Sequence, residues 1–341
     1  MHPVRHGNPP VPALRERASS FARRFECVPD GAVCARFWEF TPELGCIYDC
    51  HYCYLQKTLR FPSMAVPTHF TNYGKMLRDI ERVLAKAYPR PVIFNMGELA
   101  DSRALDDITG FSKVIVPFIT STPNGFLHML SKSDNYENLV QVDPRDAQGH
   151  VRVIQAASVN PQPVVRAVEE GTPPLTRRVR AMAKLQEAGY RIRYRFDPVF
   201  FYGDLFWRRN GDAREQASLQ ATQAMYSAMM DVVFRHTQPE MVTLGTYRPS
   251  PGLTHHIEKN HPDSPVLRVH TTYQDGKCRI GEDRRAKLYG WFVQEIRRRS
   301  PRTKVALCKE PARLWRKVGL NPTPLECSCT LFAAERRQRM T

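Results

Sequence analysis

Residues 45–56 read GCIYDCHYCYLQ, and this stretch predicts both the fold and the chemistry of the chain. Its cysteines, Cys46, Cys50 and Cys53, stand at C-x3-C-x2-C spacing. Three thiolates on one short loop can converge on a single [4Fe–4S] cluster, which normally takes four cysteine ligands. One iron is then open to an outside ligand, and the amino and carboxylate groups of S-adenosylmethionine can fill that position.

A structural zinc site is the alternative interpretation of the same cysteines. Zinc needs a fourth ligand at short range, and His51 could offer one. However, the motif comes directly after a predicted first strand, and an aromatic residue, Tyr52, precedes its last cysteine. This combination favours the cluster.

Short apolar runs alternate with amphipathic stretches along the chain. The runs predicted as strands are 35–40, 91–95, 125–130, 151–156, 191–196 and 241–246. Helices are predicted over 72–87 and 174–188, and Gly189 follows the second as a helix C-terminal signal. Such alternation predicts a parallel sheet with functional residues at the carboxyl ends of the strands. We therefore expect an α/β fold, a partial (β/α)6 TIM-type barrel with a basic C-terminal extension.

Three parts of the chain are expected. Residues 1–33 are predicted as a partly flexible leader, residues 34–250 as the barrel, and residues 251–341 as a basic extension packed on the barrel. The extension is predicted to contain a helix around 284–299 and a short strand near 304–308.

Composition narrows the class of protein further. The nine cysteines are an odd number and no secretory signal is evident, so they are interpreted as thiols and metal ligands of a cytoplasmic protein. No apolar run is long enough to span a membrane. The net charge is +16, and 17 Lys/Arg against 6 Asp/Glu between Gly276 and Thr341 account for +11 of it. This excess indicates a surface for a polyanion, or simply a solvated basic face.

The cysteine motif resembles the signature of the radical SAM superfamily, and CHYCYLQ (50–56) is similar to its spore photoproduct lyase branch. Four later blocks match that branch in order: GELADSRALDDIT (97–109), SKSDN (131–135), SVNP (158–161) and EEGTPPLTRRVRAMAKLQEAGY (169–190). The resemblance covers roughly residues 34–250. It implies an enzyme whose cluster reductively cleaves S-adenosylmethionine to a 5′-deoxyadenosyl radical, with an electron donor such as flavodoxin or ferredoxin.

The resemblance also implies which residues bind the cofactor, here Tyr52, Gly97, Glu98, Lys132, Ser158 and Asn160. The backbone of Tyr52 is expected against the adenine, and the Gly97–Glu98 element at the methionine amino group. A carboxylate beside an ammonium is a charge-assisted pair, which orients the ligand. Lys132 is expected near the cofactor carboxylate, and the last two residues near ribose or carboxylate. An ordinary loop carboxylate, a solvated lysine and an Asn-Pro turn are the alternatives.

The chain departs from the family at the residue that completes DNA repair. In spore photoproduct lyase a cysteine returns a hydrogen atom to the product radical, and the aligned residue here is Glu98. No cysteine occurs between Cys53 and Cys278. Tyr52 and Tyr54 match tyrosines of the hydrogen-return path, and Tyr54 is the candidate catalytic residue. We therefore expect a sister group within the family rather than the repair enzyme proper.

Three functions stay open at this point. The first is hydrogen abstraction from a nucleic-acid base or nucleotide, the second is radical modification of a small metabolite, and the third is a non-enzymatic, metal-stabilised nucleic-acid-binding protein. Four C-terminal cysteines, Cys278, Cys308, Cys327 and Cys329, could bind a second cluster or zinc. Their spacing alone favours buried apolar thiols.

Overall fold

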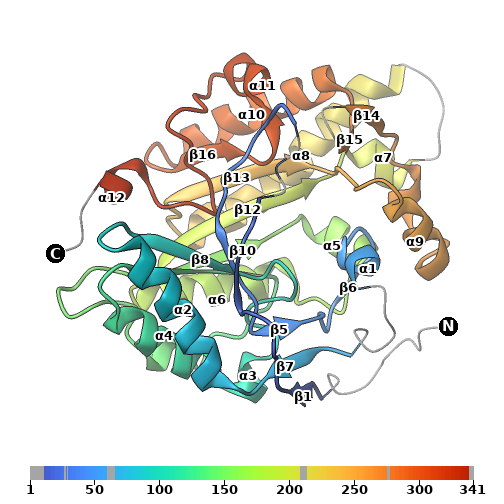
Figure 1. Ribbon diagram of the computed structural model, residues 1–341. Coiled ribbons are helices and arrows are strands. Elements are labelled where there is room, and N and C mark those ends of the chain that lie inside the picture. The colour runs from blue at the N-terminus through green and yellow to red at the C-terminus, as the bar shows by residue number, and fades with distance from the viewer. Residues whose placement is uncertain are drawn as a thin grey trace.

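The computed structural model describes residues 11–26, 28, 30–59, 66–207, 213–274 and 277–337. Its centre is an eight-stranded sheet with the order β16-β13-β12-β10-β9-β8-β4-β2 (Figure 1). The strands are β2 (Ala22–Arg24), β4 (Trp38–Phe40), β8 (Val92–Met96), β9 (Gly125–Ser131), β10 (Val153–Ser158), β12 (Arg191–Val199), β13 (Met241–Thr246) and β16 (Lys304–Leu307). From β4 to β16 neighbours are parallel and follow one another along the chain, whereas β2 pairs antiparallel with β4.

Helices cover the outside of this curved sheet (Figure 1). The long ones are α2 (Tyr73–Ala87), α4 (Ser112–Ser121), α6 (Leu175–Glu187), α8 (Ala213–His236) and α10 (Glu282–Arg299). Each buries one stripe of its surface: in α2, Met76, Ile80 and Leu84 recur every four residues and are buried. The predicted strands and helices are thus confirmed to within a few residues, because apolar periodicity directly reports the face that packs.

Short elements connect the main ones. They are strands β1 (Ala13–Arg15), β3 (Ala32–Val33), β5 (Glu43–Leu44), β6 (Asp49–Cys50), β7 (Thr68–Phe70), β11 (Glu169–Glu170), β14 (Thr272–Gln274), β15 (Lys277–Arg279) and β17 (Glu310–Pro311), and helices α1 (Leu55–Thr58), α3 (Asp106–Thr109), η2 (Leu139–Gln141), α5 (Gln162–Val168), α7 (Tyr202–Phe206), α9 (Leu253–Asn260), η3 (Pro265–Arg268), α11 (Ala312–Lys317) and α12 (Ala333–Arg337). These short strands form small sheets, which pair β6 with β11, β3 with β17, β14 with β15, and both β1 and β5 with β7. None of the helices in the described part of the chain is long and apolar enough to cross a membrane.

The sheet is open. Within the described residues its edge strands are β2 and β16, which confirms an α/β fold with a parallel sheet rather than showing a closed barrel. β2 comes from the region expected as a leader and β16 from the region expected as an extension, so both regions contribute strands. The division at residues 33 and 250 stays a prediction, and residues 1–10 of the leader lie outside the described residues.

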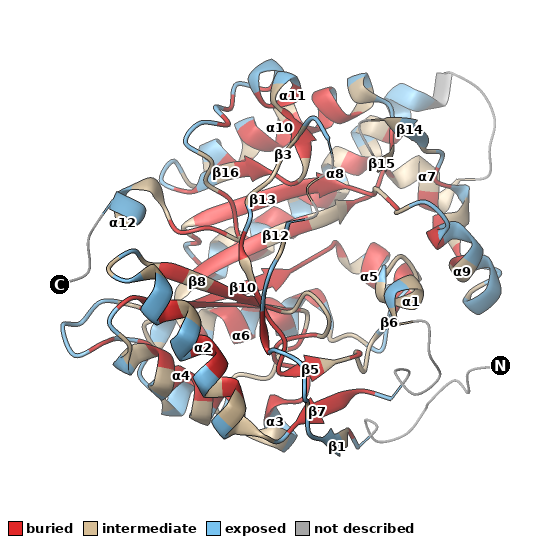
Figure 2. Cartoon of the chain, viewed as in Figure 1, coloured by how far each residue is buried: buried red, intermediate tan, exposed pale blue. Residues whose placement is uncertain are grey.

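The two faces of the sheet pack against different partners. Phe94, Leu127 and Tyr194 belong to the main apolar core with the helices, and Figure 2 shows the strands as the most buried part of the molecule. Side chains at alternate positions point to the other face. There Asn95 Nδ2 donates to Cys329 O (3.2 Å) and Arg193 Nη1 to Ser328 O (2.8 Å).

The C-terminal segment, residues 325–331, therefore lies against the inner face of the sheet. The Ser328 amide donates to Thr243 Oγ1 at 3.0 Å, and Leu331 packs on Phe126 and Ile154 near the first residues of β9 and β10. These contacts join strands β8, β9, β10, β12 and β13 to one segment that is distant in sequence. The inner side of the open sheet is thus filled by the end of the described chain.

Candidate active site

The three motif cysteines lie on the loop that leads out of β5. Cys50 pairs with Glu169 through strands β6 and β11, and the Cys53 amide donates to Cys50 O at 3.0 Å, which turns the loop into α1. The charges of Cys46 and Cys53 both act on Cys50, and burial raises the pKa of all three thiols. Three soft thiolate donors on one turn fit an iron–sulfur cluster with one open iron.

Glu169 joins three of the predicted cofactor-binding residues, Tyr52, Lys132 and Asn160. Its Oε1 accepts hydrogen bonds from the Tyr52 hydroxyl and from Asn160 Nδ2 (2.9 Å), and Lys132 Nζ lies 3.6 Å from the same atom. Arg178 Nη2 reaches Oε2 at 2.7 Å, and both of these side chains are fully buried. We call these residues, together with Ser158, the Glu169 group.

Lys132 links the ends of two neighbouring strands. It follows β9, and its Nζ donates to Ser158 Oγ, the last residue of β10, at 2.6 Å. The same ammonium lies 5.7 Å from the centroid of the Tyr52 ring. The structure therefore brings Tyr52, Lys132, Ser158 and Asn160 together at the carboxyl ends of the strands, as the parallel arrangement predicts.

The charges in this group do not cancel. Burial by itself would raise the pKa of Glu169, but Lys132 and Arg178 and the hydrogen bonds from Asn160 and Tyr52 bring it down to about 2. One carboxylate thus faces two cations, which leaves one positive charge in a buried place. An uncompensated buried charge is costly, and the carboxylate of a bound ligand would balance it.

Sequence reasoning missed Glu169 and Arg178. Both stand in the block 169–190 that carries the family resemblance, but no local spacing singles them out. Glu169 meets Tyr52, 117 residues away, through the pairing of β6 with β11. Arg178 lies on the buried face of α6, where an arginine without an acidic partner would be unstable.

Gly97 and Glu98 lie in a second, neighbouring group. Gly97 has φ +97°, and a Cβ there would stand 2.4 Å from Leu130 O, so the position requires glycine. The Tyr54 hydroxyl donates to the backbone carbonyl of Glu98. The Glu98 side chain acts on Arg195 and Cys329. Gly97, Glu98 and Tyr54 thus lie together at the end of β8.

Asp101 holds this loop on the end of β9. It accepts from Ser131 Oγ (2.6 Å) and from the Lys132 amide (2.5 Å), and also from the amides of Arg103 and Ala104. The buried carboxylate of Asp101 therefore positions the backbone of Lys132. Asp101 stands in the block 97–109, but the sequence alone indicates no role for it.

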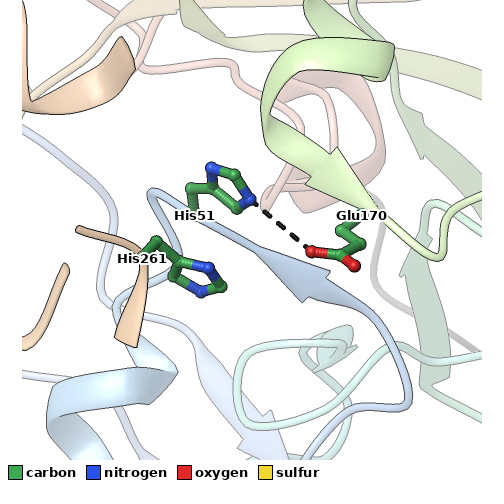
Figure 3. Close-up of side chains that lie close together, drawn as sticks. All are labelled: His51, Glu170 and His261. Atoms are coloured by element: carbon green, nitrogen blue, oxygen red, sulfur yellow. Dashed lines mark ion pairs between the residues drawn. The ribbon is translucent and has the colours of Figure 1, made fainter. Parts of the chain in front are cut away.

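His51, between two motif cysteines, lies beside His261 of the region after β13 and Glu170 of β11 (Figure 3). Its ring stacks on His261 with centroids 4.1 Å apart, and its Nε2 lies 3.7 Å from a Glu170 carboxylate oxygen. Each ring already has a further partner, since His51 Nδ1 contacts Ser264 Oγ (3.0 Å) and His261 Nε2 contacts Asp49 (3.1 Å). This group joins the cluster loop to the region after β13.

A cavity of about 400 Å³ lies away from these groups. Its lining includes Met241 and Lys304, the first residues of β13 and β16, together with Trp315 and Asn321. It therefore opens at the amino ends of the strands, opposite to the edge where the motif cysteines and the Glu169 group lie.

An open α/β sheet, parallel from β4 to β16, carries the C-x3-C-x2-C loop at the carboxyl ends of its strands, as in the radical SAM class of proteins. The sequence profile of the family "Spore photoproduct lyase" matches residues 39–250. The chain belongs to the spore photoproduct lyase family.

Two curated relatives are similar over part of their length. The spore photoproduct lyase of Geobacillus sp. (strain Y412MC61) is 27% identical over 157 residues, and that of Bacillus subtilis (strain 168) is 25% identical over 158 residues. Each match covers 46% of this chain and 44% of the relative, so it spans less than half of the relative's length.

Solved structures show the same fold. A spore photoproduct lyase double mutant with bound AdoMet and dinucleoside spore photoproduct superposes with a TM-score of 0.67 at 20% identity, over 86% of this chain and 80% of that one. Spore photoproduct lyase complexed with the dinucleoside spore photoproduct superposes with a TM-score of 0.65 at 20% identity, over 80% and 76%.

Proposed function

We propose that Cys46, Cys50 and Cys53 hold a [4Fe–4S] cluster and that the Glu169 group holds S-adenosylmethionine beside it. The observation that carries this proposal is the buried Lys132–Glu169–Arg178 set, whose excess positive charge adjoins the cysteine loop. When bound, the cluster supplies the electron that cleaves S-adenosylmethionine, and a flavodoxin or ferredoxin is the proposed source of that electron.

The residues of the chain have separate tasks in this proposal. Lys132 attracts the carboxylate of the methionine moiety, and Ser158 and Asn160 offer polar contacts to ribose or carboxylate. Tyr52 lies on Phe200, with ring centroids 5.4 Å apart, which gives the adenine an apolar neighbour. The Gly97–Glu98 element is proposed for the amino group. Tyr54 is the proposed catalytic residue, and its hydroxyl is held by the Glu98 carbonyl, directly after Cys53.

The proposed substrate is a nucleic-acid base or nucleotide, from which hydrogen is abstracted. Support comes from the dinucleoside bound in the solved relatives and from the basic C-terminal region. Part of that charge is internally paired, however, as Arg279 with Glu310 (3.2 Å) and Lys317 with Asp283 (2.8 Å). Glu98 stands at the position where spore photoproduct lyase has its hydrogen-donor cysteine. This favours a reaction whose final step differs from that of the lyase. A small metabolite is therefore the second candidate.

Anaerobic reconstitution tests this function. Protein reduced with dithionite is expected to form 5′-deoxyadenosine from S-adenosylmethionine, and the Cys50→Ala variant is expected to form none. Incubation with deuterated oligonucleotides or deuterated metabolites then separates the two substrate classes, because only the true substrate transfers deuterium into 5′-deoxyadenosine. Binding to DNA that weakens steeply with salt would support the nucleic-acid class. An intact cluster without 5′-deoxyadenosine would contradict the proposal.

A further inference from the structure

Four buried or half-buried cysteines gather on the inner side of the sheet, away from the motif loop. They come from three distant segments: Cys34 precedes β4, Cys308 follows β16, and Cys327 and Cys329 lie in the C-terminal segment. We call them the thiol tetrad. The sequence grouped Cys308, Cys327 and Cys329 with Cys278. In the structure Cys34, and not Cys278, lies with these three cysteines.

Backbone pairing brings the first two thiols together. Val33 in β3 stands opposite Glu310 in β17 in an antiparallel pair, and Cys34, the residue after Val33, is acted on by Cys308 and Lys309. Cys278 is in β15 between Lys277 and Arg279. Lys277 interacts with Lys309 and Cys308, and Arg279 donates to Lys309 O at 2.7 Å. Because side chains alternate along a strand, Cys278 points to the opposite face.

The Cys327–Cys329 pair is held in place from the sheet. Asn95 binds the Cys329 carbonyl, and Arg193 Nη1 donates to Cys327 O (3.3 Å) and Thr330 O (2.6 Å). The Cys327 and Cys329 thiols act on each other. Cys34 interacts electrostatically with Cys308 and Cys329, and Cys327 with Cys308 and Cys34. All four sulfurs therefore share one small region.

The spacing of the sulfurs distinguishes two kinds of metal site. In a tetrahedral zinc site with Zn–S bonds of about 2.3 Å, the sulfurs stand about 4 Å apart. Among the described residues, no three cysteine sulfurs lie within 4.8 Å of one another, and this holds for the tetrad and for the motif cysteines alike. In a [4Fe–4S] cluster each thiolate binds a different iron, so the sulfurs are farther apart. A compact zinc site is therefore not preformed among the described cysteines, whereas a cluster takes its four thiolates on separate irons.

The charge around the tetrad also fits an anionic group. Arg195 Nη2 donates to Cys308 Sγ at 3.3 Å, and its buried Nε has no hydrogen-bond partner within the described part of the chain. Arg248 and Lys309 act on the same thiol. Two acids act on these groups: Asp197, which binds Arg248 through both oxygens (2.8 and 2.7 Å) and also contacts Arg195 (3.4 Å), and Glu98. Cationic side chains thus lie beside these thiols, where they would offset the negative charge of a cluster with thiolate ligands.

We propose that Cys34, Cys308, Cys327 and Cys329 bind a second iron–sulfur cluster of the [4Fe–4S] type. It lies beside Glu98 and Tyr54, on the inner side of the sheet. With four protein thiolates it has no open iron, unlike the cluster of the motif loop. The proposal does not depend on cleavage of S-adenosylmethionine.

Iron analysis of variants tests the second cluster directly. The triple variant Cys46→Ala/Cys50→Ala/Cys53→Ala removes the motif site, and after anaerobic reconstitution it is expected to retain about four iron and four sulfide per chain, against about eight of each in the wild type. In that background Cys34→Ala is expected to lose the remaining iron and its absorbance, whereas Cys278→Ala is the matched control and is expected to retain both.

Several results would overturn the proposal. They are a wild type with only about four iron, a triple variant without iron, loss of iron in Cys278→Ala but not in Cys34→Ala, or stoichiometric zinc in place of iron. Circular dichroism of every variant shows whether it is folded. If one of the variants does not fold, the iron content of the wild type and of the variants that do fold still shows whether a second cluster is present. Formation of 5′-deoxyadenosine, measured separately, reports only on the motif cluster.

Discussion

Glu169 and Arg178 form an ion pair of 2.7 Å in which neither side chain is exposed to solvent. A pair of this kind stabilises a protein only while both members are present, because either charge alone in the interior is strongly unfavourable. Lys132, Tyr52 and Asn160 meet the same carboxylate. The pair is therefore the structural centre of the proposed cofactor site, and it can be tested without the cofactor.

Replacing Glu169 by glutamine keeps the shape of the side chain and removes its charge. Lys132 and Arg178 then face each other without a compensating carboxylate, and we expect the free energy of unfolding to fall by about 3–5 kcal/mol. Urea denaturation of the apo-protein measures this. Glu170→Gln is the matched control: its carboxylate is half-exposed and lies 3.7 Å from His51, so a loss below about 1 kcal/mol is expected. Equal losses in the two variants would show that the buried pair does not stabilise the fold.

The same residue predicts how stability depends on pH. The pKa of Glu169 is lowered to about 2 from an ordinary 4.5, so the folded state binds this proton less readily than the unfolded state. Its contribution, on the order of 3 kcal/mol, is present above about pH 4.5 and is lost as the pH falls towards 2. Denaturation of the wild type and of Glu169→Gln at pH 6, 4 and 3 measures the contribution of Glu169 to the free energy of unfolding. The other carboxylates titrate equally in both proteins, so their effects cancel in the difference. A stability difference that stays constant or grows as the pH falls would contradict the assignment.

Gly97 is expected to tolerate no side chain. In Gly97→Ala the new methyl group meets Leu130 O and the residue keeps φ +97°, so we expect a loss of several kcal/mol and little folded protein. Gly110→Ala is the control, since Gly110 also has positive φ (+59°) but nothing within 4 Å of its Cβ position. It should lose about 1 kcal/mol. Similar melting temperatures in both variants would show that the contact with Leu130 relaxes at no cost.

Lys132 provides a test of cofactor binding apart from turnover. Lys132→Met preserves the length of the side chain and removes the charge proposed to attract the ligand carboxylate. We expect the Kd for S-adenosylmethionine to rise about tenfold or more, which is at least about 1.4 kcal/mol. Equilibrium dialysis of reconstituted protein with equal cluster absorbance measures it. The control Lys184→Met removes an exposed lysine paired with Glu187 (2.8 Å) and should leave the Kd unchanged. An unchanged Kd in Lys132→Met would remove Lys132 from the proposed site.

Much of the architecture could be predicted from local patterns. The strand at 241–246 and the helix near 174–188 lie where apolar periodicity predicts them. The residues that bury one face of a helix or strand recur at a fixed spacing in the sequence, so the pattern is visible locally. The regions around the barrel were less predictable. β2 and β16 join the central sheet through pairing with β4 and β13, and strands of three or four residues carry too little pattern to reveal their partners.

The sequence by itself determined the cysteine loop, since Cys46, Cys50 and Cys53 lie within eight residues and their spacing already brings them together. It also determined the order of strands and helices. Only the tertiary structure decided that Glu169 meets Tyr52 and Lys132, and that Cys34 rather than Cys278 joins the C-terminal thiols. The physical reason is the same in both cases. Contacts between residues that are distant in sequence depend on strand register and packing, which no local spacing encodes.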